Sequence, residues 1–149
     1  MTTKEYQAVK DYLATLNRYN KHINRNIEQI YELKELAKGV SSVKYGDKVQ
    51  SGGSQQRMAS FVAAIMDLEE ETDALIDKYV NLKEKIIDEI LSLEKWKHRE
   101  ILLGIYVDGD NLFDVAHHLD MKYDTCKHAH KKACEKFYVK YEHNILYNT

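Results

Sequence analysis

The chain has no proline among its 149 residues, and only six of its residues are glycine. Proline and glycine interrupt helices and form turns, so their scarcity excludes a fold of many short strands joined by tight turns. Five of the glycines fall between segments of helical periodicity, and only Gly104 lies within one. With 44% hydrophobic and 31% charged residues, the composition predicts an all-α fold of long amphipathic helices.

Cysteine and long apolar runs are also scarce. Cys126 and Cys134 lie eight residues apart on one predicted helix, which is roughly 12 Å along its axis. A disulfide needs Cα atoms within about 7 Å, so these two thiols cannot pair, and we expect both to be buried. No apolar run approaches the ~20 residues of a membrane span, and the first residues have no signal-peptide core. We therefore expect a cytoplasmic protein that does not enter a membrane.

Charge of one sign is not in excess, because the formal net charge is −2, but it is unevenly distributed. The segment 55–96 has five basic and ten acidic residues, and its acidic cluster is interpreted as a solvated helix face. The segment 121–140 has six lysines and two acidic residues, a local balance of +4. The C-terminal segment is therefore the candidate for contact with a polyanion.

Residues 1–96 are predicted to form a long antiparallel helical hairpin, a coiled-coil-like arm. Apolar residues recur at steps of three and four over 3–38, and the pattern resumes after residue 54 for about 40 residues. We interpret 39–54 as a flexible loop that begins where Gly39 ends the first helix, and contact of this loop with a partner stays open. Asn20 interrupts the first apolar seam, where an asparagine often sets register and partner number.

The second helix of this hairpin has an apolar face too wide for one partner helix. Its seam of Met58, Phe61, Ile65, Leu68, Leu75, Leu82, Ile86 and Leu93 is widened by Ile76, Val80, Ile87 and Ile90. A face of that width usually meets more than one helix. We therefore expect a homodimer formed through the long helices.

Residues 97–149 are predicted to form a helix-turn-helix bundle. A first short helix carries Ile101, Leu102 and Ile105 on its apolar face and ends at the segment 107–110. Asn111 then occupies the position of an N-cap, with Asp114 at the spacing of a capping box. The second helix buries Leu112, Val115, Ala116 and Leu119, and Met121 fills the break over 120–122. From about Tyr123 the third helix turns Cys126, Ala129, Ala133 and Phe137 inward.

The outer face of the third helix combines cations with short polar groups. A helix that enters the major groove needs cations for phosphates and polar groups for base edges. The candidate DNA-binding residues are therefore Lys122, Tyr123, Asp124, Thr125, Lys127, His128, Lys131 and Lys132. We assign Lys127, Lys131 and Lys132 to phosphates, and Tyr123, Asp124, Thr125 and His128 to base edges. The alternative is a three-helix bundle whose last helix is merely solvated by its lysines.

A known motif has the same pattern. The segment 111–116, followed by 125–127 and by Lys132 and Ala133, resembles the region-4 helix-turn-helix of bacterial sigma factors. Over nearly its whole length, the chain resembles small phage-encoded ArpU/RinA-like transcriptional regulators. It departs from their pattern at Lys122, where a serine or threonine cap is usual, and at Cys126, where an aliphatic anchor is usual.

The resemblance implies a sequence-specific DNA-binding transcriptional regulator of phage or prophage late genes, with the helix from Tyr123 in the major groove. The implied partners are double-stranded DNA, a second copy of the chain and, since sigma region 4 also contacts it, host RNA polymerase. Two other functions stay open. The chain could be a small terminase-like recognition subunit for phage DNA packaging, or an interaction protein that binds RNA polymerase without reading DNA.

Other groups of reactive residues in the sequence do not have the spacing of a metal site or a catalytic site. Cys126, His130 and Cys134 recur every four residues, but they spread over roughly 12 Å and cannot all reach one metal ion. No nucleophile lies in a pattern with a base, and the loop lacks a phosphate-binding motif. We expect no enzyme activity, no metal and no cofactor. The tail 139–149 is expected to pack Tyr141 and Ile145 on the core, with contact to the DNA backbone as the alternative.

Overall fold

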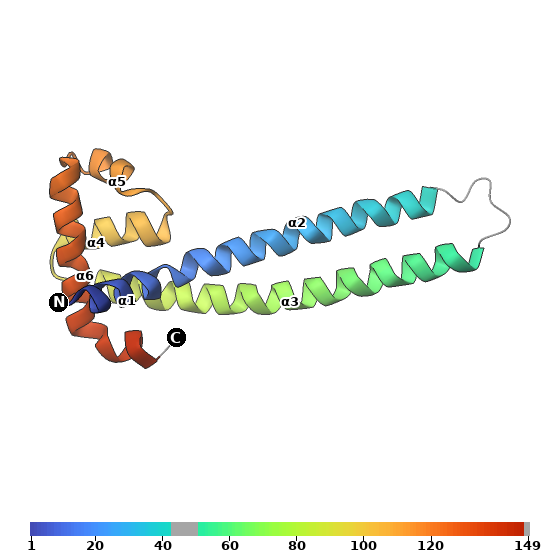
Figure 1. Ribbon diagram of the computed structural model, residues 1–149, viewed down its shortest axis with the longest axis horizontal. Coiled ribbons are helices and arrows are strands. Elements are labelled where there is room, and N and C mark those ends of the chain that lie inside the picture. Colours follow the sequence, from blue (N-terminus) through green and yellow to red (C-terminus); the bar gives the residue numbers. More distant parts are fainter. Residues whose placement is uncertain (43–50, 148–149) are drawn as a thin grey trace. The chain divides into compact units, whose positions relative to one another are not determined.

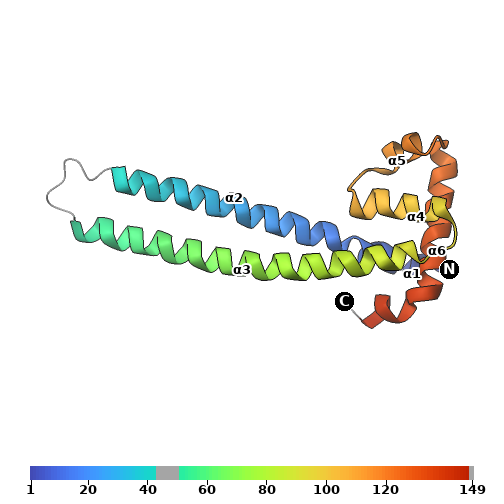
Figure 2. The ribbon, with the colours of Figure 1, turned by 180° about the vertical axis from the view of Figure 1, so that it is seen from behind.

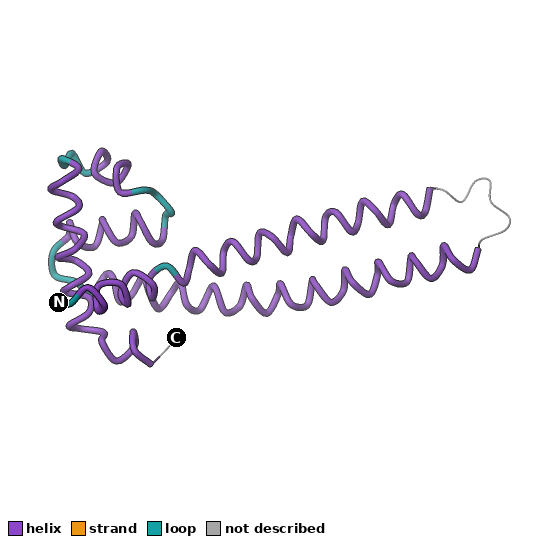
Figure 3. Tube along the Cα trace, viewed as in Figure 1, coloured by secondary structure: helices purple, strands orange, loops and turns teal. Residues whose placement is uncertain are grey.

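The computed structural model describes residues 1–42 and 51–147, and within these ranges it has helices and no strand (Figures 1 and 3). In chain order the elements are α1 (Thr3–Leu13), α2 (Thr15–Ser42), α3 (Ser51–Leu91), α4 (Trp96–Leu102), the π-helical turn η1 (Leu103–Val107), α5 (Leu112–His118) and α6 (Tyr123–Tyr147). The all-α prediction is confirmed.

The long helices extend further into the segment 39–54 than predicted. The helix α2 continues past Gly39 to Ser42, so the prediction that Gly39 ends it is wrong. A glycine inside a helix costs about 1 kcal/mol relative to alanine, which the 28 residues of α2 tolerate. The helix α3 already begins at Ser51. The remainder of the predicted loop, residues 43–50, lies outside the described residues, and its contact with a partner stays a prediction.

The single helix predicted over 3–38 is instead two helices that meet at Ala14. The Thr15 hydroxyl donates to the Asp11 carbonyl at 3.1 Å, and the Arg18 guanidinium reaches the same oxygen at 3.4 Å. Threonine side chains that bond back to the preceding turn compete with the backbone and bend helices. The backbone at Ala14 stays in the right-handed helical region, but its ψ of −7° is far from the roughly −42° of a regular α-helix, and α1 ends there. Apolar periodicity alone does not reveal such a bend, because the spacing of apolar residues continues through it.

The chain forms two compact units. The terminal unit comprises Met1–Tyr19 together with Tyr79–Thr149, and the hairpin unit comprises Asn20–Lys78. These units differ from the ranges 1–96 and 97–149 predicted from the sequence, because α1 and the end of α3 belong to the terminal unit with α6. The start of α2 and the end of α3 thus belong to the terminal unit, and the remaining residues of both helices belong to the hairpin unit.

In the hairpin unit, the α2 and α3 segments run antiparallel (Figures 1 and 2). The α2 residues that are buried or half-buried recur at steps of three and four: Ile23, Asn26, Ile30, Leu33, Ala37 and Val40. Asn20, predicted to interrupt the apolar seam, is exposed, and Ile27, seven residues further along at a position that continues the same seam, is 50% exposed. The buried polar residue of α2 is Asn26, whose Nδ2 has no hydrogen-bond partner among the described residues.

The acidic cluster of α3 is exposed, as predicted, and two of its members, Glu69 and Glu71, contact basic side chains of α2. Lys34 Nζ lies 3.2 Å from Glu69, and His22 Nε2 lies 3.7 Å from Glu71. All four side chains are about half exposed, so these pairs contribute little to stability and chiefly favour the antiparallel register.

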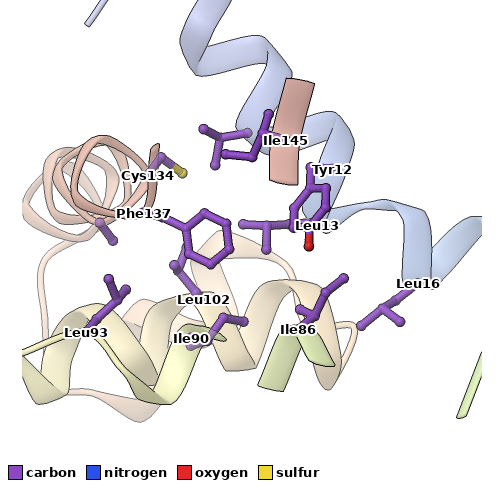
Figure 4. Close-up of a cluster of buried hydrophobic side chains, with 12 residues drawn as sticks. Tyr12, Leu13, Leu16, Ile86, Ile90, Leu93, Leu102, Cys134, Phe137 and Ile145 are labelled. Atoms are coloured by element: carbon purple, nitrogen blue, oxygen red, sulfur yellow. The ribbon is translucent and has the colours of Figure 1, made fainter. Parts of the chain in front are cut away.

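The main core of the terminal unit brings together α1, α3, α4 and α6 (Figure 4). Phe137 of α6 is fully buried among side chains that include Leu13, Ile90 and Leu102. The other buried members are Val9, Tyr12, Leu16, Ile86, Leu93, Ala133, Cys134 and Ile145. The prediction that Ala133 and Phe137 face inward is confirmed. This core fixes one side of α6 and leaves its opposite side to solvent.

A buried carboxylate at the edge of this core is bound from two helices. Tyr12 donates to Glu89 Oε1 at 2.6 Å, and Asn144 Nδ2 donates to Oε2 at 3.1 Å. Burial, and then the adjacent Glu89 carboxylate, raises the pKa of Tyr12, so its hydroxyl stays a donor. These hydrogen bonds link α1 and α6 to α3. They also give the Glu89 side chain, which would be costly to bury alone, two hydrogen-bond donors.

Candidate nucleic-acid interface

A short, capped helix and a tight turn position the start of α6. The Asn111 side chain accepts from the Asp114 amide at 2.8 Å, which confirms the predicted N-cap. After α5 the chain turns at Asp120, which has a left-handed φ of 52°, and the Met121 amide donates to the Ala116 carbonyl at 2.9 Å. The next helix begins at Tyr123, as predicted.

A second, smaller core packs α4, η1, α5 and the start of α6 together. Its buried residues are Ile101, Val115, Ala116 and Cys126, and half-buried Ile105, Leu112, Leu119, Met121 and Ala129 pack around them. These residues come from α4, η1, α5, α6 and the turn between α5 and α6, as the helix-turn-helix prediction requires. The inward positions assigned to Cys126 and Ala129, and the plug assigned to Met121, are confirmed.

The close approach between α5 and the preceding helical turn occurs at Gly104. A Cβ atom at Gly104 would lie 2.9 Å from Val115 Cγ2, closer than side chains approach one another. From the sequence, Gly104 was expected only to interrupt a helix. The absence of a side chain at Gly104 therefore lets η1 lie against α5.

We expect Gly104→Ala to lower the free energy of unfolding by about 1–3 kcal/mol, the usual cost of overpacking a core. Val115 is stiff and 97% buried, so it cannot move aside without disturbing its neighbours. In a Val115→Ala background the same substitution should cost much less, since the clashing methyl groups are gone. Urea denaturation of the four proteins measures this difference, and an equal cost in both backgrounds would contradict the packing account.

The eight candidate residues all lie exposed, Lys122 directly before α6 and the other seven within it. They are Lys122, Tyr123, Asp124, Thr125, Lys127, His128, Lys131 and Lys132. None of the ion pairs within residues 1–42 and 51–147 involves these four lysines, so no carboxylate neutralises them. Lys131 Nζ also lies 5.9 Å from the centre of the Tyr6 ring. One side of α6 is thus packed, and the other presents three lysines, with Lys122 directly before the helix.

A buried histidine on the packed side joins three elements. His130 of α6 is 6% exposed, and its Nδ1 lies 3.0 Å from the Tyr6 hydroxyl of α1. Its Nε2 lies 2.8 Å from the Tyr106 hydroxyl of η1. Burial, aided by the nearby Lys10, lowers the pKa of His130 to about 4, so the ring is neutral at physiological pH. A neutral imidazole has one donor and one acceptor nitrogen, which matches two tyrosine hydroxyls.

The cysteines and His130 do not converge on one point. Cys134 Sγ lies 3.6 Å from His130 Nε2, whereas Cys126 belongs to the second core. Burial raises the pKa of the Cys134 thiol to about 12, so it is not the thiolate that metals bind. Within the part of the chain that the structure describes, no three His, Cys, Asp or Glu side chains are grouped to hold a metal ion. The two cysteines are free and buried.

The C-terminal residues continue α6 after a kink and pack on the core. Tyr141 has non-helical angles, and its hydroxyl bonds to the Ser92 hydroxyl at the end of α3. Ile145 is 2% exposed. The prediction that these two residues pack on the core is confirmed, and Tyr147 stays largely exposed.

A second group of basic residues, not predicted from the sequence, lies beside α6. Lys95 and His98 follow α3, and Lys136 and Lys140 lie in the later turns of α6, where they line one groove. No local pattern connects residues some 40 positions apart, so only the packing of α4 against α6 reveals the groove.

Comparisons with protein-family models, curated proteins and solved structures found no match to this chain. None of the helices in the described ranges has a stretch of 18 residues apolar enough for a lipid bilayer.

Proposed function

We propose that this protein binds double-stranded DNA sequence-specifically through α6 and regulates transcription, as in the phage and prophage late-gene regulators that it resembles. One observation carries the proposal. Three lysines without carboxylate partners and four other exposed side chains share one side of the first turns of α6, and a fourth such lysine, Lys122, directly precedes the helix. Cys126, Ala133 and Phe137 anchor the other side. The major groove of DNA admits an α-helix, and a helix that follows a tight turn and has its cations on one side is suited to enter it.

The residue types suit two kinds of contact. Lys127, Lys131 and Lys132 would bind phosphates, which gives affinity at every sequence. Tyr123, Asp124, Thr125 and His128 would meet base edges, where short polar groups discriminate between base pairs. Lys122 precedes the helix and would meet the backbone beside its entry point.

A homodimer through the hairpin unit completes the proposal. Large apolar side chains there remain exposed, namely Ile27, Tyr31, Leu36, Val62, Met66 and Ile76. Association of two hairpins would cover them, and a two-fold dimer would present two α6 helices to half-sites about one DNA turn apart. Sedimentation equilibrium tests this, and a monomer at the concentrations used for DNA binding would rule it out.

The first test is the salt dependence of binding. We expect Lys127→Ala with Lys131→Ala to weaken binding to every duplex, roughly tenfold to a hundredfold at 0.15 M salt. The slope of log affinity against log salt should fall by roughly 2, because each phosphate contact contributes about 0.9. Fluorescence anisotropy at four salt concentrations measures both quantities.

The comparison variant separates phosphate contacts from base contacts. Thr125→Ala with His128→Ala removes no lysine, so the salt slope should stay close to that of the parent. The ratio of affinities for a selected site and a scrambled duplex should fall, since a good base contact contributes about 1–3 kcal/mol of discrimination. A parent slope retained by the double lysine variant would reject the phosphate assignment.

A further inference from the structure

A basic groove lies beside α6, outside the eight residues assigned to the duplex. It has a volume of about 480 Å³ and lies between the turn from α3 to α4 and the later turns of α6. Its charged and polar lining residues are Ser92, Glu94, Lys95, His98, Lys136 and Lys140. Three lysines against one glutamate give it a net charge of +2 with His98 neutral. A groove with this charge suits an anionic ligand.

The lysines of the groove have no carboxylate partner in the described part of the chain. Lys140 donates to the Ser92 carbonyl at 3.0 Å, and Arg99 donates to the next two carbonyls at 2.7 and 2.9 Å. The carbonyl oxygens of the turn are therefore occupied by cations. The ammonium groups of Lys95 and Lys136 make no hydrogen bond or ion pair with the described residues, and both side chains are exposed, so these groups are available to a ligand.

His98 also lines the groove without a partner. It is 7% exposed, and its ring makes no hydrogen bond within residues 1–42 and 51–147. Burial lowers its pKa, and Lys95, Lys136 and Lys132 lower it further. Positive charges thus crowd around a largely buried ring that has an unused donor, and a bound anion would relieve their repulsion.

The groove is continuous with the proposed DNA-binding surface. Lys132, Lys136 and Lys140 are spaced four residues apart, so they follow one side of α6 over roughly 12 Å. A DNA strand presents a phosphate about every 3.4 Å along the duplex axis. The row of lysines is therefore long enough to contact more than one phosphate, next to the site where the first turns of α6 would enter the DNA major groove.

We propose that this groove binds the phosphate backbone of the same duplex, next to the segment read by the first turns of α6. The inference rests on the proposed DNA-binding function. Lys95 and Lys136 bind phosphate oxygens, Lys140 adds positive charge from its bond to the turn, and the His98 N–H donates. None of these groups reaches base edges, so the groove raises affinity without changing sequence preference.

The test is the salt slope of Lys95→Gln with Lys136→Gln in the full chain. We expect the slope of log affinity against log salt to fall by roughly 2, and the affinity ratio of selected to scrambled duplex to stay unchanged. The charge-matched control is Lys21→Gln with Lys78→Gln, two exposed lysines of the hairpin unit. The control should keep the parent slope, and circular dichroism checks that both variants are folded.

The outcomes separate this inference from the proposed function. A parent that binds DNA and a groove variant with the parent slope would overturn the inference alone, whereas a parent without DNA binding would overturn both. The His98 ring signals in NMR identify the source of the phosphate. They should shift with a short duplex, and a shift with a mononucleotide but not with the duplex would assign the groove to a small molecule and overturn the proposal.

Discussion

Phe137→Ala is expected to lower the free energy of unfolding by about 3–5 kcal/mol, the largest effect we predict for a single substitution. Phe137 is fully buried and contacts side chains from α1, α3 and α4, so truncation leaves a cavity that no single element can close. Urea denaturation followed by circular dichroism measures this loss. Binding of DNA should weaken only as far as the folded fraction falls, because Phe137 lies on the packed side of α6.

The matched control is Val139→Ala, two residues along the same helix. Val139 is 76% exposed, so its truncation should change stability by less than about 0.5 kcal/mol. A loss of similar size in both variants would mean that the C-terminal half of α6 responds to helix propensity rather than to core packing. That result would contradict the anchoring of α6 described above.

Acid is expected to destabilise the terminal unit through His130. The unfolded chain binds a proton at His130 below pH 6.5, whereas the folded chain binds it only near pH 4. Stability from this residue is therefore present above pH 6.5 and is lost as the pH falls toward 4. Since one pKa unit corresponds to about 1.4 kcal/mol, the loss approaches about 3.5 kcal/mol. Protonation also removes the acceptor nitrogen that a tyrosine hydroxyl needs.

The measurement compares unfolding free energies at pH 7 and pH 4.5 in the parent and in His130→Gln. The variant should be less stable at pH 7, because the buried hydrogen bonds of His130 to Tyr6 of α1 and Tyr106 of η1 are lost. It should nevertheless lose about 2 kcal/mol less than the parent on acidification. The control is His117→Gln, an exposed position that should keep the pH dependence of the parent. Equal pH dependence in the parent and His130→Gln would contradict a buried, neutral His130.

The local elements of the C-terminal part followed from the sequence because their signals are local. The Asn111 cap, the break over 120–122 and the inward turn of Cys126 and Phe137 each depend on residues within a few positions. The alternation of apolar and polar residues in these short helices was therefore enough to predict the helices and turn of the C-terminal part. The reciprocal half of the predicted capping box is absent, since only the Asn111 side chain bonds to Asp114.

The partners of each helix could not be predicted. An amphipathic pattern says that a face is buried, but not which helix covers it, so α1 was assigned to the hairpin although it packs against α6. The bonds of Tyr6 and Tyr106 to His130 join positions 124 and 24 residues apart in the chain. The burial of Asn26, in place of the exposed Asn20, likewise depends on which face of α2 the neighbouring helix covers.

The most direct test of the account is selection of bound fragments from random double-stranded DNA by the full chain, followed by affinity measurements at several salt concentrations. The account predicts enrichment of a common sequence, tighter binding to it than to scrambled DNA, and an affinity that falls steeply with salt and falls further with Lys127→Ala and Lys131→Ala. A folded protein that binds no duplex at 50 mM salt, or that enriches no sequence, would contradict it.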